Sequence, residues 1–254
     1  HRDLHSFPTR RSSDLLDGYL HSFHPHGTRK WKSWGNAGFL SDPSFSISFS
    51  PDGRVLYLSG FDQAISAVRA ADGIVQWSKF TGMKWNRAVL VDSQGNLYCL
   101  SVDSLGLYVF SADPNGQERW RYRISTSTWN SGYGSDFVMD WDGFLYVFNG
   151  AMLYSFDYAG QLRWQREFGG YSDLCPLLCD GDNVIYGLAY SEPTSQGQIR
   201  GFAQDGTVKF EMTLDRYGTT IGAIGENNTL YFTSGEALVP PNPTPRYKAL
   251  YAVR

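Results

Sequence analysis

Histidine is scarce in this chain of 254 residues, and the few present lie near its start. His21, His24 and His26 are the last of five, and no histidine occurs from residue 27 onward. A Ser-His-Asp catalytic triad is therefore excluded from residues 27–254. The segment His24–Gly27 favours an exposed turn over a metal site, because no Cys or carboxylate stands nearby at ligand spacing.

Cysteine is also rare, with three copies at Cys99, Cys175 and Cys179. In an extended strand, Cys175 and Cys179 would lie on one side but about 13 Å apart. A disulfide within that strand is therefore excluded, because bridged Cα atoms lie within about 7 Å. We expect these cysteines to be small buried hydrophobes.

Long apolar runs, helical periodicity and a basic surface are missing too. No run approaches the ~18 apolar residues of a membrane-spanning helix. The 22 Lys and Arg residues are dispersed against 25 Asp and Glu, a net charge of −3, so the basic footprint of a nucleic-acid-binding protein is absent. The low lysine content and abundant Trp, Tyr, Ser and Asn favour an extracytoplasmic location, in the periplasm or at the cell surface.

What the chain does contain is a repeat. A glycine followed by a large aromatic residue recurs at steps of 46, 43, 44 and 46 residues. The pairs are Gly27–Trp31, Gly73–Trp77, Gly116–Trp120, Gly160–Trp164 and Gly206–Phe210. Aliphatic-Tyr pairs behind turn signals, such as Leu97-Tyr98 and Leu145-Tyr146, follow in phase. This regularity predicts one repeated supersecondary unit.

Each unit is predicted to contain four short strands. In residues 87–124 the strands are expected at 87–91, 96–102, 107–111 and 118–124, separated by Asp/Asn-Gly turns of the kind found in hairpins. Four antiparallel strands per repeat are typical of a β-propeller blade. The fold class predicted is therefore all-β, a β-propeller of four-stranded antiparallel blades.

The segment Leu153-Tyr154-Ser155-Phe156-Asp157-Tyr158-Ala159-Gly160-Gln161-Leu162-Arg163-Trp164 resembles the repeat of the pyrroloquinoline-quinone-like (PQQ-like) β-propeller family. The resemblance covers about residues 17–254. It implies relatives that act as outer-membrane assembly scaffolds, as sensor domains or as dehydrogenases, often with seven or eight blades. The dehydrogenases bind the quinone with Ca²⁺ and can carry an adjacent-cysteine disulfide, and this chain has no adjacent Cys pair.

The first fifteen residues do not share the repeat. Residues 1–15 resemble an in-frame translation of a common short-read sequencing adapter, and we expect them to be foreign to the fold. Residues 16–254 are then a truncated PQQ-like propeller domain. We expect four whole blades and two partial ones, from a parent with seven or eight.

The recurring aromatic residue has a predicted structural role. Blades bury their apolar faces against neighbours, and a large ring at a fixed place in the fourth strand can fill each interface. We expect this inter-blade role for Trp31, Trp77, Trp120, Trp164 and Phe210.

Candidate binding residues lie in the connections from each fourth strand to the next blade. We expect these connections to share one face around the channel mouth with residues 189–198 and the proline-rich segment 234–248. Loops on a rigid scaffold are where binding usually resides. The candidates are Trp34, Trp85, Asn86, Arg87, Trp129, Asn130, Tyr133, Tyr171, Asp173, Arg216 and Tyr217. The alternative is that their aromatic rings merely cap the blade interfaces.

Two carboxylate-rich segments, 140–143 and 180–183, lack a full Ca²⁺-binding loop with its distal Glu and are interpreted as turns. The function predicted is a non-catalytic binding or scaffold propeller of the bacterial cell envelope, with a protein or glycan partner and no cofactor or metal. The alternatives left open are a fragment of a PQQ-dependent dehydrogenase, with PQQ and Ca²⁺, and a glycan-binding module.

Overall fold

The structure is a computed structural model. It describes residues 19–34, 46–59, 64–82, 85–126, 135–168, 177–191, 196–214, 218–234 and 249–253. Residues 1–15, which we expect to be foreign, lie outside these ranges. The chain forms two compact units, residues 1–89 and 90–254.

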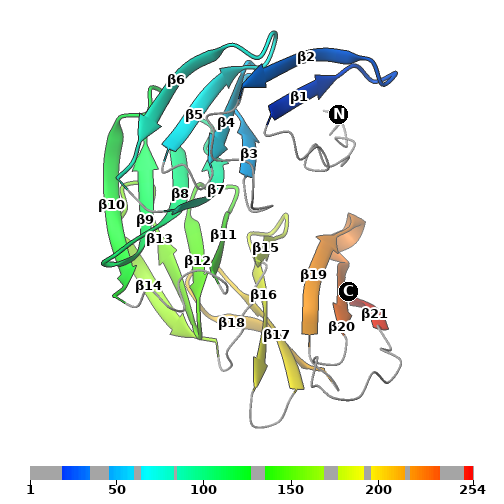
Figure 1. The fold of residues 1–254 in the computed structure, drawn as a ribbon. Coiled ribbons are helices and arrows are strands. Elements are labelled where there is room, and N and C mark those ends of the chain that lie inside the picture. Colours follow the sequence, from blue (N-terminus) through cyan, green and yellow to red (C-terminus); the bar gives the residue numbers. More distant parts are fainter. Residues whose placement is uncertain are drawn as a thin grey trace, which may run out of the picture. The chain divides into compact units, whose positions relative to one another are not determined.

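The described residues form strands and one short 3₁₀ helix, with no α-helix (Figure 1). Consequently, none of them belongs to a helix long and apolar enough to cross a membrane. The strands are β1 (Tyr19–Phe23), β2 (Arg29–Trp34), β3 (Ser46–Phe49), β4 (Val55–Ser59), β5 (Ala64–Arg69), β6 (Val75–Phe80), β7 (Trp85–Val91), β8 (Leu97–Asp103), β9 (Gly106–Ala112), β10 (Glu118–Ser125) and β11 (Ser135–Met139). They continue with β12 (Leu145–Asn149), β13 (Met152–Phe156), β14 (Leu162–Glu167), β15 (Leu177–Cys179), β16 (Ile185–Ser191), β17 (Gln196–Phe202), β18 (Val208–Thr213), β19 (Gly218–Ile224), helix η2 (Glu226–Asn228), β20 (Leu230–Ser234) and β21 (Ala249–Val253).

Consecutive strands form sheets in chain order. Four sheets have four strands each, β3–β6, β7–β10, β11–β14 and β15–β18, while β1–β2 form a pair and β19–β21 a sheet of three. The pairings within them are antiparallel, for example β11 with β12, β12 with β13 and β13 with β14. The all-β fold predicted from the sequence, with four whole repeats and two partial ones, is confirmed.

The repeated glycine lies in the hairpin between the third and fourth strands. In the β13–β14 hairpin, Gly160 has φ +83° and its amide donates to the backbone oxygen of Asp157 at 3.0 Å. The Asp157 carboxylate also accepts the amides of Ala159 and Gln161. A positive φ costs glycine little, so the period of the sequence marks one tight turn in each sheet.

The apolar core lies on the middle strands and between neighbouring sheets of the second unit. One cluster combines Tyr146, Phe148 and Leu153 with residues of the next sheet, including Leu177 and Ile185. A second cluster links Leu188 and Ile199 to Leu230 and Phe232. These clusters hold the sheet β11–β14 against β15–β18, and β15–β18 against β19–β21.

Trp31, Trp120 and Trp164 each contact the third turn of the following sheet. The indole N–H of Trp120 donates to the backbone oxygen of Tyr158 at 3.0 Å, and a Cβ added to Gly160 would lie 2.5 Å from its Cδ2. Trp164 repeats this with the backbone oxygen of Gln204, at 2.7 Å, and with Gly206. In the first unit, Trp31 does so with Ala70 and Gly73.

The five recurring rings are half-buried, although the sequence argument treated each as a buried interface residue. The physical reason is their position on the last strand of each sheet. Trp120, for example, is covered on one side by Tyr98 of its own sheet, with ring centroids 5.9 Å apart, and it contacts the turn of the next sheet. Part of each ring remains accessible to solvent.

Candidate functional site

The first hairpin of three successive sheets is built on an aspartate. Asp92, Asp140 and Asp180 each accept, through one carboxylate oxygen, the backbone amides two and four residues further on, at 2.8–3.0 Å. An aspartate that binds nearby backbone in this way fixes a tight turn. The turns follow β7, β11 and β15 directly.

The second carboxylate oxygen of each aspartate binds a tyrosine hydroxyl. Tyr98, Tyr146 and Tyr186 donate to Asp92, Asp140 and Asp180 at 2.9, 2.8 and 3.0 Å. Burial raises the pKa of Tyr98 and of Tyr186 to about 12 and raises that of Tyr146 as well. The phenols therefore remain protonated donors at neutral pH.

Two of the three sheets extend this chain of contacts. Arg163 donates to the hydroxyl oxygens of Tyr146 and Ser155, at 3.5 and 3.0 Å, and Arg119 does the same to Tyr98 and Ser111. In the sheet β15–β18, Lys209 and Gly201 occupy the arginine and serine positions, and Phe210 replaces the tryptophan. The polar chain thus ties the first turn to the fourth strand in β7–β10 and β11–β14.

Replacing Tyr146 by phenylalanine tests this polar chain. Asp140, only 6% exposed, would lose a donor, so we expect the free energy of unfolding to fall by about 1–2 kcal/mol in urea denaturation. The exposed ring of Tyr158 gives the matched control, and Tyr158→Phe should change stability by less than about 0.5 kcal/mol. Equal stability of the two variants would contradict a structural role for the Tyr146 hydroxyl.

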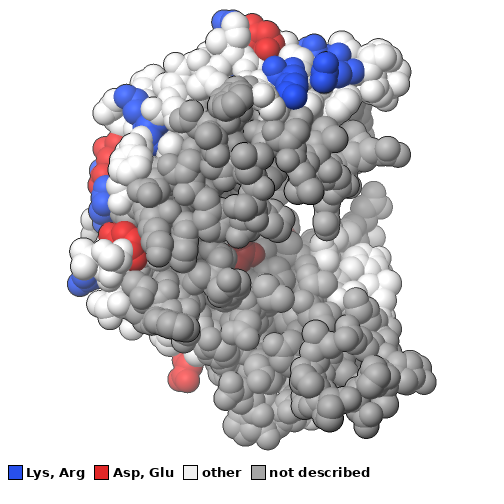
Figure 2. Space-filling model, in the orientation of Figure 1, with Lys and Arg blue, Asp and Glu red and all other residues white. Residues whose placement is uncertain are grey.

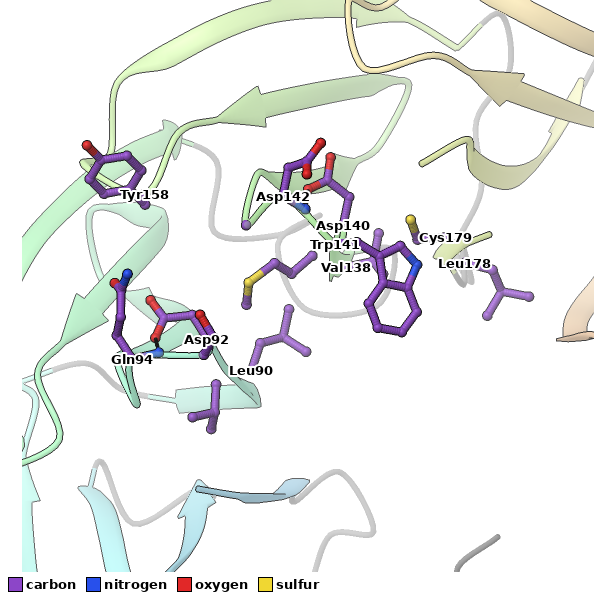
Figure 3. A pocket seen from close by; sticks show the side chains of 14 residues that line it. Leu90, Asp92, Gln94, Val138, Asp140, Trp141, Asp142, Tyr158, Leu178 and Cys179 are labelled. Atoms are coloured by element: carbon purple, nitrogen blue, oxygen red, sulfur yellow. Dashed lines mark hydrogen bonds between the residues drawn. The ribbon is translucent and has the colours of Figure 1, made fainter. Parts of the chain in front are cut away.

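A cavity of about 630 Å³ lies where β7, β11 and β15 end. Its lining consists of the ends of these strands, the two turns that follow β7 and β11, and Tyr158 from the β13–β14 turn (Figure 3). The lining residues are Leu90, Val91, Asp92, Ser93, Gln94, Val138, Met139, Asp140, Trp141, Asp142, Gly143, Tyr158, Leu178 and Cys179. This volume is typical of small-ligand pockets, which span roughly 300–1,000 Å³.

Trp141 is the most exposed large side chain of the cavity, with 75% of its surface accessible. In Figure 3 its ring extends toward the strand that carries Leu178 and Cys179, where the indole N–H donates to the backbone oxygen of Asp180 at 3.0 Å. The ring is therefore anchored at one edge while its surface stays open to a ligand.

Asp140 and Asp142 are held together by a neutral side chain. The Nε2 of Gln204 donates to both carboxylates, at 2.9 and 2.7 Å, and Asn183 also donates to Asp142 at 3.1 Å. Two carboxylates bound to one nitrogen lie within a few ångströms of each other. Their charges repel, and neither donor carries a positive charge to compensate them.

The ionisable groups described in the cavity lining are Asp92, Asp140, Asp142, Tyr158 and Cys179, and no His, Lys or Arg is among the described lining residues. Burial raises the pKa of the Cys179 thiol to about 12. A protonated thiol is a poor nucleophile. Among the residues that the structure describes, no group of three or more His, Cys, Asp and Glu side chains could hold a metal ion.

None of the described lining residues of this cavity is among the binding candidates that the sequence favoured. Trp129, Asn130, Tyr133, Tyr171, Asp173, Arg216 and Tyr217 lie outside the described residues. Trp34 ends β2, and Trp85, Asn86 and Arg87 begin β7; for these four the structure describes only the backbone. The cavity lies where β7 ends, whereas Trp85, Asn86 and Arg87 lie where β7 begins.

The cavity includes a segment that the sequence analysis interpreted only as a turn. Residues 140–143 do form a turn, but they also line the cavity. A signal was present in the sequence, an aspartate followed six residues later by a tyrosine, at Asp92–Tyr98, Asp140–Tyr146 and Asp180–Tyr186. It marks the ends of the first strands, where the cavity is found.

No family model matches the chain, and no curated protein matches it either. Solved structures do match. A streptogramin B lyase structure superposes with a TM-score of 0.55 at 14% identity, covering 84% of this chain and 70% of that one. Virginiamycin B lyase from Staphylococcus aureus gives a TM-score of 0.55 at 12% identity, covering 82% and 69%. Both are β-propellers, and at these identities the similarity shows the fold alone.

Proposed function

We propose that this chain is a non-catalytic binding and scaffold β-propeller of the bacterial cell envelope, built from PQQ-like repeats and holding a partner protein. One observation carries the proposal, the preformed cavity at the ends of β7, β11 and β15. Its walls are turns fixed by Asp92 and Asp140, whose carboxylates are engaged in structural hydrogen bonds. A rigid site whose two turn-forming aspartates are already engaged is suited to binding.

A quinone-dependent dehydrogenase is the alternative that the family resemblance raises, and the cavity does not suit its cofactor. The quinone carries carboxylates, whereas the described lining residues include Asp92, Asp140 and Asp142 and no Lys, Arg or His. Repulsion between the carboxylates of the quinone and those of the lining disfavours binding. The cavity therefore supports no chemical step through that cofactor.

A lyase activity is suggested by the names of the structural neighbours. Proton abstraction requires a base with an available lone pair near the substrate. Asp140 accepts two backbone amides, the Tyr146 hydroxyl and the Gln204 amide, so its oxygens are already occupied. Asp142 accepts Asn183 and Gln204 through one oxygen, Oδ2, so it is the lining residue on which a lyase activity would depend, and the turnover assays below test it.

Turnover assays test the proposal. The chain is incubated with the quinone, Ca²⁺ and a redox dye in the presence of alcohols or sugars, and separately with virginiamycin B. We expect no substrate-dependent dye reduction and no change in the mass of the antibiotic. Sustained turnover in either assay that is lost in the Asp142→Asn variant would overturn the non-catalytic proposal.

The location in the cell envelope rests on composition, with Trp, Tyr, Ser and Asn frequent and Lys rare. Among the described residues of the face drawn in Figure 2, Lys and Arg lie singly or in small groups, with Asp and Glu nearby. This distribution gives no support for nucleic acid as the partner.

A further inference from the structure

The cavity carries an excess of negative charge. Three aspartates line it, Asp180 follows the lining residue Cys179, and none of the described lining residues is basic. Arg119 and Arg163 bind the hydroxyls of Tyr98 and Tyr146 and so offset part of the charge of Asp92 and Asp140. The partners described for the Asp142 carboxylate are the neutral amides of Asn183 and Gln204. A positively charged ligand would relieve this excess.

The same carboxylates have little capacity left to bind sugar hydroxyls. Each oxygen of Asp92 accepts two donors, the amides of Gln94 and Asn96 on one, and the Asn96 side chain and Tyr98 hydroxyl on the other. Asp140 is occupied in the same way. Hydrogen bonds from neutral groups use up the acceptor sites but leave the charge, so the cavity attracts a cation more strongly than a neutral glycan.

The rest of the lining suits the stem of such a ligand. Leu90, Val138, Met139 and Leu178 supply apolar surface, and the exposed ring of Trp141 offers the π face that binds cations most strongly. Gln94 and Tyr158 lie on the other side of the drawn cavity from Trp141 (Figure 3). An apolar chain ending in a positive group would meet complementary surface along its length.

We propose that this cavity binds the lysine or arginine side chain of a partner protein, with the stem on the apolar residues and the charged end near Trp141 and Asp142. The proposal rests on the binding function proposed above and assigns its ligand chemistry. Charge complementarity selects the basic side chain, and the need for an apolar stem excludes a bare inorganic cation.

Isothermal titration calorimetry with the whole chain tests whether binding depends on the positive charge of the ligand. The probe is a capped pentapeptide with one arginine among alanines, and the control is the same peptide with citrulline, which keeps the shape and loses the charge. We expect the arginine peptide to bind at least about tenfold more tightly, with an affinity that falls as salt is added. Equal binding of both peptides, or of neither, would overturn the inference.

Two charge-insertion variants locate the binding site. Ser93 is exposed in the cavity lining, and Asn115 is exposed in the β9–β10 turn outside it. Ser93→Lys should lower the affinity for the arginine peptide at least about tenfold, whereas Asn115→Lys should leave that affinity unchanged. The two variants should have equal melting temperatures. Equal weakening by both would show general attraction to an acidic protein and would overturn the cavity as the site.

Two further titrations distinguish a partner protein from a small organic cation and from a glycan as the natural ligand. Free butylguanidine that binds as tightly as the peptide would overturn a partner protein as the source and leave a small organic cation. A neutral disaccharide that binds in competition with the peptide would favour a glycan and overturn the charge argument. Turnover in the assays above would overturn the binding function itself, which is a separate result from the loss of peptide binding.

Discussion

Gly106→Ala is expected to destabilise the second unit strongly, and more than the same substitution at Gly143. Gly106 begins β9 with φ +148°, and an added Cβ would lie 1.8 Å from the backbone oxygen of Ser125 in β10. Asp103 accepts the amides of Leu105 and Gly106 and fixes this turn. Because the clash involves backbone, no rotamer change relieves it. We expect a loss of at least about 3 kcal/mol.

Thermal unfolding followed by circular dichroism measures this loss, with Gly143→Ala as the matched control. Gly143 also has a positive φ, of +85°, but an added Cβ would meet nothing within 4 Å. Gly143→Ala should therefore lower the free energy of unfolding only by the cost of a positive φ for alanine, roughly 1–2 kcal/mol. Similar melting temperatures for the two variants would show that β10 moves aside at no cost, contrary to the packing described.

Trp164→Ala should give the second large effect. The ring packs on Tyr146 at 5.8 Å, lies against Gly206 of the next sheet and donates to Gln204. Since it is half-buried, we expect about 2–4 kcal/mol, somewhat below a fully buried tryptophan. The melting temperature should fall by roughly 5–15 °C.

Two controls separate packing from hydrogen bonding. Trp164→Phe keeps a ring, as Phe210 does in the next sheet, and should cost about 1 kcal/mol for the lost hydrogen bond. Trp141→Ala loses the same type of hydrogen bond, to Asp180, from an exposed ring, and should cost about as little. If Trp141→Ala lowers the melting temperature as much as Trp164→Ala does, then packing of the Trp164 indole on the neighbouring turn is not the main contribution of Trp164 to stability.

The sheets could be predicted from sequence because their signals are local. Alternation and turn residues fixed the strands of residues 87–124 to within about two residues at each end, since both depend on nearest neighbours along the chain. The glycine of each third turn was found for the same reason. Gly160 must adopt a conformation that other residues avoid, and that constraint is visible without any tertiary contact.

The cavity could not be predicted in this way. It depends on where three separate strand ends meet, and Leu90, Val138 and Leu178 are ordinary strand residues until they are brought together. Gln204 and Asp140 are in contact although they are 64 positions apart in the sequence, and no local pattern near either residue predicts this contact. The sequence argument searched the loops, where aromatic residues were conspicuous, and interpreted the aspartates only as turn formers.

The tryptophan contacts all point in one direction along the chain. Trp31 reaches forward to Ala70, Trp120 to Tyr158 and Trp164 to Gln204, so these three indoles each bind the sheet that follows their own. Phe210 has no N–H and ends this series of donors. Within the second unit, a repeat copied from β7–β10 or β11–β14 would bring both its own indole donor and an acceptor turn. Such an array can lengthen during evolution in steps of one unit while the contact between units stays the same.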